Sequence, residues 1–460
     1  MTGGATHRLA RWVSSLDASS LSCEVGHKVR SCMLDVFACA AAGAVSDPMR
    51  RLVTALTDGD TSGPGKIWFG SRTCSVWTEA FVHGAYIHAL DYDDSHRGSK
   101  THPGASVVPA VLAATRTEDV DLSDAVAGLV AGYEVVMRLG SAVGVAEHRR
   151  QGWHATSTCG TVGAAAAVAR ALRLDPAHTA SALGNATTQA AGLWAFSTDG
   201  TMNKKFHPGH AARAGLGAAL LARAGVTGSS VGLEAADGGF FAAFAPVRPA
   251  AVWEAVIDAV GEPFLLPEVA VKPYPCCRTA HSAIDAARRV REAAGCNIED
   301  IAEVAVSTYR IGVDQCGFHD PVNETQAAFS TPYVVACALR DGWVGPEHFT
   351  EASVQDPGLR ELHRRVAVEV DEVLDSRFPT VWAARVTVRL RSGQTFNAEV
   401  DVALGDPLVP MSTEQINAKA STCLGSVGPK SASELGASIL DLPSRGPAAM
   451  LTEVLDCWRV

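Results

Sequence analysis

The hydrophobic pattern of the chain changes its period near residue 268, and this change limits the folds that the chain can adopt. Before it, segments such as DAVAGLVAGYEVVMRLGSAVG (124–144) place apolar residues three and four apart, which predicts helices. After it, the segment 383–404 alternates apolar and polar residues, which predicts two half-buried strands joined at Ser392 and Gly393. The sequence therefore predicts a mainly α fold with a smaller α+β domain.

The length of 460 residues exceeds what one hydrophobic core usually holds, so we expect two domains. Residues 1–267, completed by residues 407–460, are predicted to form a large all-helical domain. Residues 268–406 are predicted to form the smaller α+β domain, a lid on the first. Within these domains the patterns predict helices at 161–174, 210–228 and 325–342 and strands at 301–311 and 364–374. Clefts between domains are common ligand sites.

Composition excludes several classes of function. The formal net charge of −10 argues against nucleic acid as a partner, because phosphate binding requires a basic surface. The twelve cysteines include no CxxC pair, which argues against zinc and iron–sulfur sites, and no metal or cofactor is predicted. The N-terminus lacks the apolar core of a signal peptide, and no run of about 18 uninterrupted apolar residues predicts a membrane span. These features predict a cytoplasmic enzyme.

The segment HALDYDDSHRGSKTHPG (88–104) gathers carboxylates, histidines and cations in a chain that is otherwise rich in Ala and Gly. Its aspartates are similar to the magnesium-binding motif of helical prenyl-transfer enzymes, so a metal-dependent prenyl-transfer reaction is one alternative. Against this alternative, no second cluster of metal-binding residues follows on a later helix. Asp93 and Asp94 are instead predicted to be turn and N-cap residues, and His96 is predicted to be exposed.

Two histidines are candidates for proton transfer. His102 precedes Pro103, which favours an extended backbone and a fixed direction for the imidazole. His154, in GWHATSTCG (152–160), comes directly before an Ala-rich helix, whose positive N-terminal end lowers the pKa of a nearby imidazole. A neutral imidazole at pH 7 can accept a proton, so His154 is a candidate base. The alternative for each is a loop histidine without a catalytic role.

Two further segments combine lysine with polar side chains that can bind anions. GTMNKKFHPGHAARAG (200–215) leads into a helix, and VKPYPCCRTAHSAIDAARR (271–289) lies at the expected domain junction. Lysine is scarce in this chain, so its presence in these segments favours carboxylate binding or proton donation over a solvated surface charge. A nucleophilic Cys277 would need an activated thiolate. The candidates in the two segments are Lys204, His207, Lys272, Cys277, Arg278 and His281.

Taken in order, the motifs HALDYDDSH…THPG, GWHATSTCGTVGAAAA, KKFHPGHAARAG and KPYPCCRTAHSAIDAA resemble those of the MmgE/PrpD family, and the resemblance extends over residues 8–455. The family includes 2-methylcitrate dehydratase, cis-aconitate decarboxylase and iminodisuccinate epimerase. The resemblance implies a large helical domain, a smaller α+β lid domain, a homodimer, and no metal or organic cofactor. It also implies that a small polycarboxylate binds between the domains.

The resemblance assigns family positions in the first half of the chain to residues of this sequence. The active-site Asp of the family's LDFDD-like segment corresponds to Asp91, and the Thr that follows it corresponds to Ser95. The His of the HP motif corresponds to His102, and the His of the GFH-like motif corresponds to His154. The loop before His102 is one residue longer than in the family.

The later motifs supply two lysines and one departure from the family pattern. The lysines of the K-x-x-H-x-G and K-x-[FY]-P segments correspond to Lys204 and Lys272. Cys277 stands where the decarboxylase branch has a His, whereas the next His of the family pattern is present as His281. The cysteine puts decarboxylation in doubt, because a proton donor is replaced.

These assignments predict a cofactor-independent lyase, a dehydratase or decarboxylase, acting on a di- or tricarboxylate such as 2-methylcitrate or cis-aconitate. An epimerase or isomerase of an aminopolycarboxylate with the same residues is the alternative. The imidazoles would transfer protons while the cations hold the substrate carboxylates. The predicted catalytic residues are Asp91, His102, His154 and Lys204, and the predicted substrate-binding residues are Ser95, His207, Lys272, Cys277, Arg278 and His281.

Overall fold

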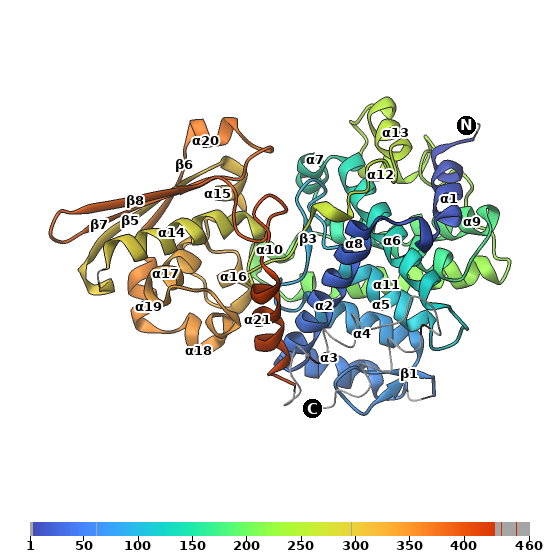
Figure 1. The fold of residues 1–460 in the computed structure, drawn as a ribbon, viewed down its shortest axis with the longest axis horizontal. Coiled ribbons are helices and arrows are strands. Elements are labelled where there is room, and N and C mark those ends of the chain that lie inside the picture. Colours follow the sequence, from blue (N-terminus) through green and yellow to red (C-terminus); the bar gives the residue numbers. More distant parts are fainter. Residues whose placement is uncertain (1–2, 61, 296, 428–433, 435–447, 449–460) are drawn as a thin grey trace.

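The computed structural model describes residues 3–60, 62–295, 297–427, 434 and 448, which form two lobes (Figure 1). One hydrophobic core lies in the larger, helical lobe, and a second lies in the smaller lobe, which combines a four-stranded sheet with helices. The predicted fold class, mainly α with a smaller α+β part, is confirmed.

The larger lobe contains the helices of the first half of the chain and three very short strands. Its helices are α1 (Ala5–Ser15), α2 (Cys23–Ala44), α3 (Asp47–Thr57), α4 (Val76–His88), α5 (Gly104–Ala114), α6 (Leu122–Val143), α7 (Val145–Arg150), α8 (Ala155–Ala171), α9 (Pro176–Thr187), α10 (Phe196–Asp199), α11 (Asn203–Arg223), α12 (Phe240–Phe244) and α13 (Ala250–Asp258). Its strands are β1 (Gly65–Lys66), β2 (Thr73–Cys74) and β3 (Ser95–His96).

Two glycines set the crossing of α4 and α11. A Cβ on Gly84 of α4 would lie 2.7 Å from Cα of Gly209, and a Cβ on Gly209 of α11 would collide with the carbonyl oxygen of Phe81. The two backbones can approach this closely only because both Cβ atoms are missing. The crossing places His88, the last residue of α4, beside Lys204 near the start of α11.

Helix α6 lies inside the larger lobe, where it packs against α8. By length and composition alone α6 could cross a membrane, but 89% of its most apolar window is buried inside the protein. Its apolar surface is therefore covered by neighbouring helices of the same lobe, as expected for a core helix.

The smaller lobe is built on a sheet with the strand order β6-β5-β7-β8. Strands β5 and β6 are parallel, and the β5–β7 and β7–β8 pairs are antiparallel. Helices α14 and α17 contact the sheet, and they lie on one side of it in Figure 1. Strand β4 (Val269–Ala270) precedes this lobe in sequence, and its Val269 belongs to the core of the larger lobe. The elements of the smaller lobe are α14 (His281–Ala294), β5 (Ile301–Thr308), α15 (Arg310–Cys316), α16 (Glu324–Ala328), α17 (Thr331–Asp341), α18 (Glu351–Val354), α19 (Pro357–His363), β6 (Val366–Val370), α20 (Glu372–Ser376), β7 (Ala384–Leu390) and β8 (Thr395–Val400).

The predicted period of two is confirmed in β5 and β7, whose side chains alternate between buried and partly exposed, and the predicted hairpin at Gly393 is the β7–β8 turn. The single helix predicted at 325–342 was wrong. Ser330 separates α16 from α17, and its hydroxyl accepts from the backbone amide of Tyr333 and so caps α17. The strand predicted at 364–374 ends at Val370, after which α20 follows.

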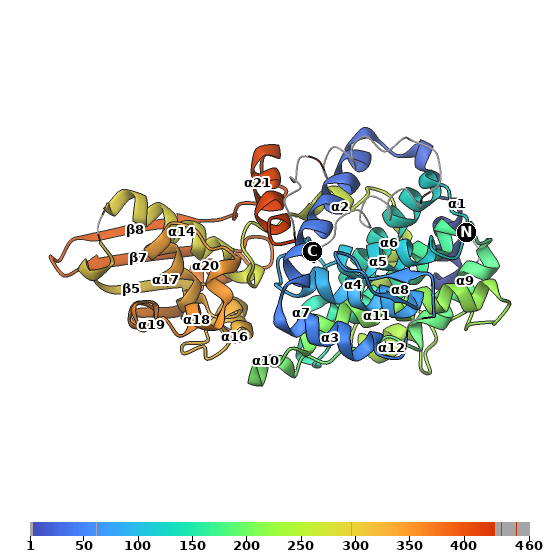
Figure 2. The ribbon, with the colours of Figure 1, turned by 90° about the horizontal axis from the view of Figure 1, so that it is seen from below.

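Helix α21 (Thr413–Leu424) follows the smaller lobe in sequence but packs against α2 of the larger lobe. In both views it stands at the junction of the two lobes (Figures 1 and 2). Its buried residues, including Ala420 and Leu424, belong to the core of the larger lobe. Most of the remaining predicted tail to residue 460 lies outside the described residues, and the boundary at 267/268 stays a prediction.

Strand β3 joins the polar segment 88–104 to the connection between the lobes. Ser95 pairs with Ala270, and His96 pairs with Val269, in an antiparallel ladder with β4. The polar segment 88–104 is thereby held at the point where the chain passes from one lobe to the other.

Candidate active site

A cavity of about 800 Å³, partly open to solvent, lies where the two lobes meet. Most of its lining comes from the larger lobe, and Cys277, Arg278, Thr279, Gln315, Phe329 and Trp382 come from the smaller lobe. Its charged lining consists of one carboxylate, that of Asp91, and the five cations Arg97, Lys100, Arg149, Lys204 and Arg278. The cavity is therefore strongly cationic although the chain as a whole is acidic.

The carboxylate of Asp91 is the centre of the charged cluster. Its Oδ1 lies 3.0 Å from Nζ of Lys204 and 3.0 Å from Nζ of Lys272. Lys272 also donates to the backbone carbonyl of Asp91, which holds this residue at a φ of 51°, in the left-handed region. Burial would raise the pKa of Asp91, but the two ammoniums outweigh burial and hold the pKa well below its usual range.

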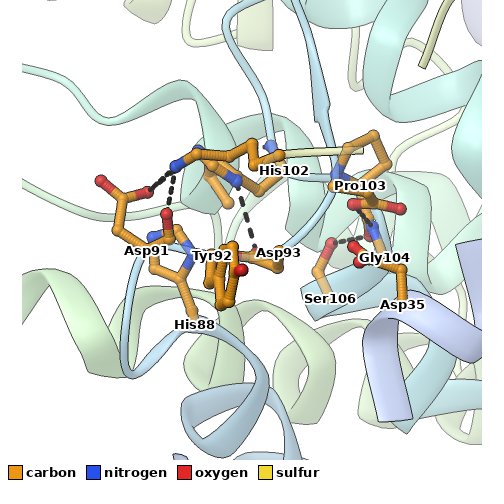
Figure 3. Close-up of polar contacts among 12 residues, drawn as sticks. Asp35, His88, Asp91, Tyr92, Asp93, His102, Pro103, Gly104 and Ser106 are labelled. Carbon is orange, nitrogen blue, oxygen red and sulfur yellow. Dashed lines mark hydrogen bonds and ion pairs between the residues drawn. The ribbon is translucent and has the colours of Figure 1, made fainter. Parts of the chain in front are cut away.

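The carboxylate of Asp93 lies between two imidazoles. Nδ1 of His88 is 2.9 Å from both of its oxygens, and Nδ1 of His102 is 3.3 Å from Oδ2. Nε2 of His102 lies 3.5 Å from Asp91, and Nε2 of His88 lies 2.9 Å from Nζ of Lys204. Figure 3 shows His88, Asp91, Asp93 and His102 gathered in one place. Burial is the main reason why the pKa of His88 falls to about 4.

His88, Asp91, Asp93 and His102 offer ligand atoms that all lie within 4.8 Å of one another, a spacing that a metal ion could use. A divalent cation there would lie beside Lys204 and Lys272, whose ammonium groups are already within hydrogen-bond distance of the Asp91 carboxylate. Charge repulsion by the two ammoniums disfavours a metal at this cluster.

His154 is the N-cap residue of α8 and faces the same cavity. Its Nδ1 lies 2.9 Å from Nδ1 of His207, and its ring packs edge-on against Trp194 with centroids 5.2 Å apart. Burial, followed by the charges of neighbouring histidines and Lys204, holds the pKa of His154 well below 6.5, the direction expected from the sequence. Burial likewise lowers the pKa of His207 to about 4.

The wall contributed by the smaller lobe carries two cysteines in contact through a threonine. Oγ1 of Thr279 lies 3.1 Å from Sγ of Cys277 and 2.9 Å from Sγ of Cys316, the last residue of α15. The hydrogen bond from Cys316 is the main reason why the pKa of Cys277 falls to about 6. A thiol with that pKa is largely thiolate at pH 7.

Of the residues predicted from sequence, seven line the cavity and three do not. Lys272 is fully buried and supports Asp91, His207 supports His154, and His281 contacts Arg278 through its Nδ1 at 3.0 Å. These three act on residues that line the cavity, and direct substrate contact by them stays a prediction. The seven that line it are Asp91, Ser95, His102, His154, Lys204, Cys277 and Arg278.

Two sequence-based predictions in the segment 88–104 were wrong. His96 is buried rather than exposed, because its Nδ1 bonds Ser99 and β3 places it against β4. Asp93 is not a turn or N-cap residue, because its carboxylate is held by the two imidazoles. Asp94 is fully buried, where it accepts from Tyr133 Oη at 2.5 Å and from the first amide of α5.

Sequence reasoning missed several residues of the cavity and its cluster. His88 ends a helix three residues before Asp91, and this position beside the charged segment was a usable signal. Arg149 and Trp194 lie outside the recognised motifs, and nothing in their local sequence pointed to the cavity. Lys100 lies inside the segment 88–104, but the family resemblance assigns no role to its position.

Comparisons with known proteins agree over nearly the whole chain. A family model described as the MmgE/PrpD N-terminal domain matches residues 7–251, and one described as the MmgE/PrpD C-terminal domain matches residues 274–441. Cis-aconitate decarboxylase of Aspergillus terreus is 27% identical over 99% of this chain and 96% of its own length. Cis-aconitate decarboxylase of Homo sapiens is 29% identical over 77% of this chain and 76% of its own length.

Proposed function

The chain belongs to the MmgE/PrpD family, and from this premise we propose that it is a lyase that removes carbon dioxide or water from a small polycarboxylate. The observation that carries the proposal is the cavity itself, in which five cations face one carboxylate beside a cluster of histidines. Such a lining stabilises an anionic ligand and the additional negative charge of a carbanion-like transition state. The homodimer implied by the family resemblance stays a prediction.

Decarboxylation of a cis-aconitate-like tricarboxylate is the reaction that the relatives' names support. In this reaction the bond between a methylene carbon and its carboxylate breaks, and carbon dioxide leaves. The electron pair of the broken bond forms a new double bond between the methylene carbon and its neighbour. The electron pair of the original double bond is then protonated at the carbon that carries another carboxylate. The enzyme must therefore supply one proton and stabilise the charge that develops on the remaining carboxylate.

His102 is the proton donor in this scheme. Its two ring nitrogens face the carboxylates of Asp91 and Asp93 at 3.5 and 3.3 Å, so a proton-carrying imidazole is oriented by both. Lys204 reaches the cavity and stabilises the charge on the substrate carboxylate, whereas Lys272, buried behind it, holds Asp91 in place.

His154 and Ser95 complete the polar contacts to the substrate. Because the pKa of His154 is low, its imidazole is neutral at pH 7 and serves as a hydrogen-bonding group or base rather than as an acid. The hydroxyl of Ser95 is buried, lines the cavity and has no hydrogen-bond partner in the described part of the chain. A substrate carboxylate or hydroxyl would satisfy it.

Dehydration of a hydroxy-tricarboxylate is a second candidate, and Cys277 is the observation that favours it. With a pKa of about 6, the Cys277 thiol is deprotonated at pH 7, and the resulting thiolate can accept a proton but cannot donate one. Cys277 occupies the position where the decarboxylase branch has a His. Removal of water begins with abstraction of a proton next to a carboxylate, which a thiolate in the cavity wall could perform.

Incubation of the purified enzyme with cis-aconitate, citrate, 2-methylcitrate and iminodisuccinate, followed by mass detection, tests the proposal. Loss of one carbon dioxide supports decarboxylation, loss of one water supports dehydration, and conversion without a change of mass would support the epimerase alternative. Proton NMR in deuterated water then locates the carbon that exchanges. Turnover of none of these compounds would contradict a polycarboxylate lyase.

Two variants test the assigned residues against a matched control. We expect His154→Ala and Lys204→Ala each to abolish detectable turnover, because each removes a group that faces the substrate. His178→Ala changes the same residue type at an exposed position, where the imidazole pairs with Asp175, and should leave turnover unchanged. Full activity of either cavity variant would refute its assignment.

A further inference from the structure

Three of the five cations in the cavity wall are already paired with protein carboxylates. Lys204 lies 3.0 Å from Asp91. Arg97 and Arg278 both lie 3.5 Å from Oδ2 of Asp406, so one carboxylate serves two guanidiniums. A substrate anion that binds to these groups competes with carboxylates that the protein itself supplies.

The other two cations, Lys100 and Arg149, form no ion pair with a carboxylate among the residues that the structure describes. Nε of Arg149 is buried and has no hydrogen-bond partner in the same part of the chain. Buried donors in folded proteins are usually hydrogen-bonded, so this Nε, in a residue that lines the cavity, is available to an anionic ligand. Burial lowers the pKa of both groups. The neighbouring thiols of Cys277 and Cys316 raise the pKa of Lys100, whereas the charge of Arg149 lowers it, so the two cations repel each other.

Aromatic rings position both cations without neutralising them. Cζ of Arg149 lies 4.3 Å from the ring centroid of Trp194, and Nζ of Lys100 lies 5.4 and 5.3 Å from the rings of Phe378 and Trp382. Contact with a ring face attracts a cation but accepts no conventional hydrogen bond. The planar guanidinium can therefore still donate from its edge to a carboxylate, in the two-bond geometry that arginine favours.

The pair is connected to the reacting cluster through Trp194. The ring of Trp194 contacts both the imidazole of His154 and the guanidinium of Arg149. An anionic group held by Arg149 would thus lie near His154. Because Lys204 lines the same cavity, a substrate with several carboxylates could contact both cations.

The backbone at Lys100 gives an independent reason to assign this side chain a role. Lys100 has a φ of 49°, in the left-handed region, where glycine or asparagine would be less strained. A lysine at such a position costs free energy, and at a residue that lines the cavity this strain agrees with a functional role for the side chain.

We propose that Arg149 and Lys100 form a second carboxylate-binding site, which takes the carboxylate of a di- or tricarboxylate substrate that is remote from the reacting carbon. This inference rests on the proposed function and adds a determinant of specificity to it. The bound carboxylate would satisfy the unpartnered Nε of Arg149 and relieve the repulsion between the two cations. Substrates without this carboxylate would bind less tightly.

The experiment compares cis-aconitate with an unsaturated dicarboxylate that lacks the remote carboxylate, in wild type, Arg149→Gln and Lys100→Met. We expect each variant to raise KM for cis-aconitate about 10-fold or more, the typical effect of losing a hydrogen bond to a charged group, with kcat changed less than about threefold. KM for the dicarboxylate should be the same in the variants as in wild type. The variants should therefore lose the preference for cis-aconitate over the dicarboxylate that wild type shows. Equal losses on both substrates, or no loss on either, would overturn the proposal.

Arg150→Gln is the matched control, because Arg150 is the next residue of α7, is exposed and pairs with Glu147. It should change neither KM. Lys100→Arg should recover most of the affinity, since it restores the charge. If Arg149→Gln does not fold, as judged by its thermal transition, Lys100→Met decides the proposal alone.

Calorimetric binding of propane-1,2,3-tricarboxylate, a saturated probe that needs no turnover, separates this proposal from the proposed function. If wild type turns over no polycarboxylate but binds the probe, and both variants weaken binding about 10-fold while Arg150→Gln does not, the second site is supported and the lyase assignment fails. If the enzyme is active and the variants bind the probe as wild type does, the second site is wrong and the lyase assignment stands.

Discussion

Two buried groups of lysine and carboxylate flank the same short segment, residues 91–93, and they are built differently. On one side Lys419 of α21 lies 2.5 Å from Asp35 of α2 and donates to the carbonyl oxygen of Tyr92. On the other side Asp91 meets two lysines and a histidine at the edge of the cavity. The first group is one cation on one anion, sealed from solvent.

The difference lies in the balance of charge. A sealed pair of one lysine and one carboxylate has no capacity for a further ion, and its role is to fix α21 and Tyr92 in position. Around Asp91 two lysines meet one carboxylate, and the cavity beside it is lined by five cations and only that carboxylate among the described residues, which leaves a surplus of positive charge at the cavity wall. The pKa values of the two carboxyl groups differ in the same way. Burial raises the pKa of Asp35, whereas the two lysines outweigh burial and hold the pKa of Asp91 low. Surplus charge beside a cavity, rather than buried charge as such, marks the functional site.

Replacing Lys204 by Met should give the largest effect on activity. The variant removes the cation that faces the developing charge, and we expect kcat/KM to fall about 10³-fold. The melting temperature should change little, because Lys272 still neutralises Asp91. Turnover measured by mass detection, together with a thermal melt, checks both statements. A variant that unfolds would show that this group is structural, like the pair at Asp35.

Replacing Lys419 by Met should give the opposite result. The carboxylate of Asp35 is left buried without a cation, which is expected to lower the free energy of unfolding by about 3–5 kcal/mol. The kcat of the folded fraction should remain within a few-fold of wild type. Urea unfolding and turnover at low temperature measure the two quantities. The double variant Asp35→Leu, Lys419→Met is the control, because removing both charges should restore most of the stability.

The dependence of stability on pH should also separate the two groups, since only the cavity group contains histidines. The pKa of His88 is about 4 in the folded protein and about 6.5 in a free imidazole, so the unfolded chain binds more protons between these values. Stability from this residue is fully present above pH 6.5 and is lost as the pH falls toward 4, by about 3 kcal/mol. Unfolding at a series of pH values should show this slope, and His88→Gln should flatten it. An unchanged slope in the variant would contradict the assignment.

The sequence predicted the fold class and the order of the motifs because both are encoded locally. The change from a helical to a period-two pattern reports which side chains face a core, and it was correct for α6, α8 and the β7–β8 hairpin. The motif segments supplied most residues of the cavity for the same reason, since each motif lies at or near the end of a helix or strand.

The sequence could not predict which distant side chains meet. Lys419 and Asp35 are 384 residues apart, and no local pattern indicates that they pair. The burial of His96 depends on β4, a strand of two residues, and the pairing of Asp93 with two imidazoles depends on the fold of the whole segment. Arg149 was missed because an arginine without a partner looks like any other arginine until the cavity around it is known.

The smallest predicted effect concerns Cys277, which opposes the surplus positive charge. Above pH 6 its thiolate repels an anionic substrate, so KM of wild type should rise as the pH passes upward through about 6, and Cys277→Ser should lack this rise. A single charge in a partly hydrated cavity is worth about 1 kcal/mol, so KM should differ about fivefold between the two proteins at pH 8. The ratio of the two KM values cancels the titration of the histidines, which both proteins share. A loss of kcat of about 100-fold in Cys277→Ser would instead make the thiolate a proton acceptor, and would favour dehydration over decarboxylation.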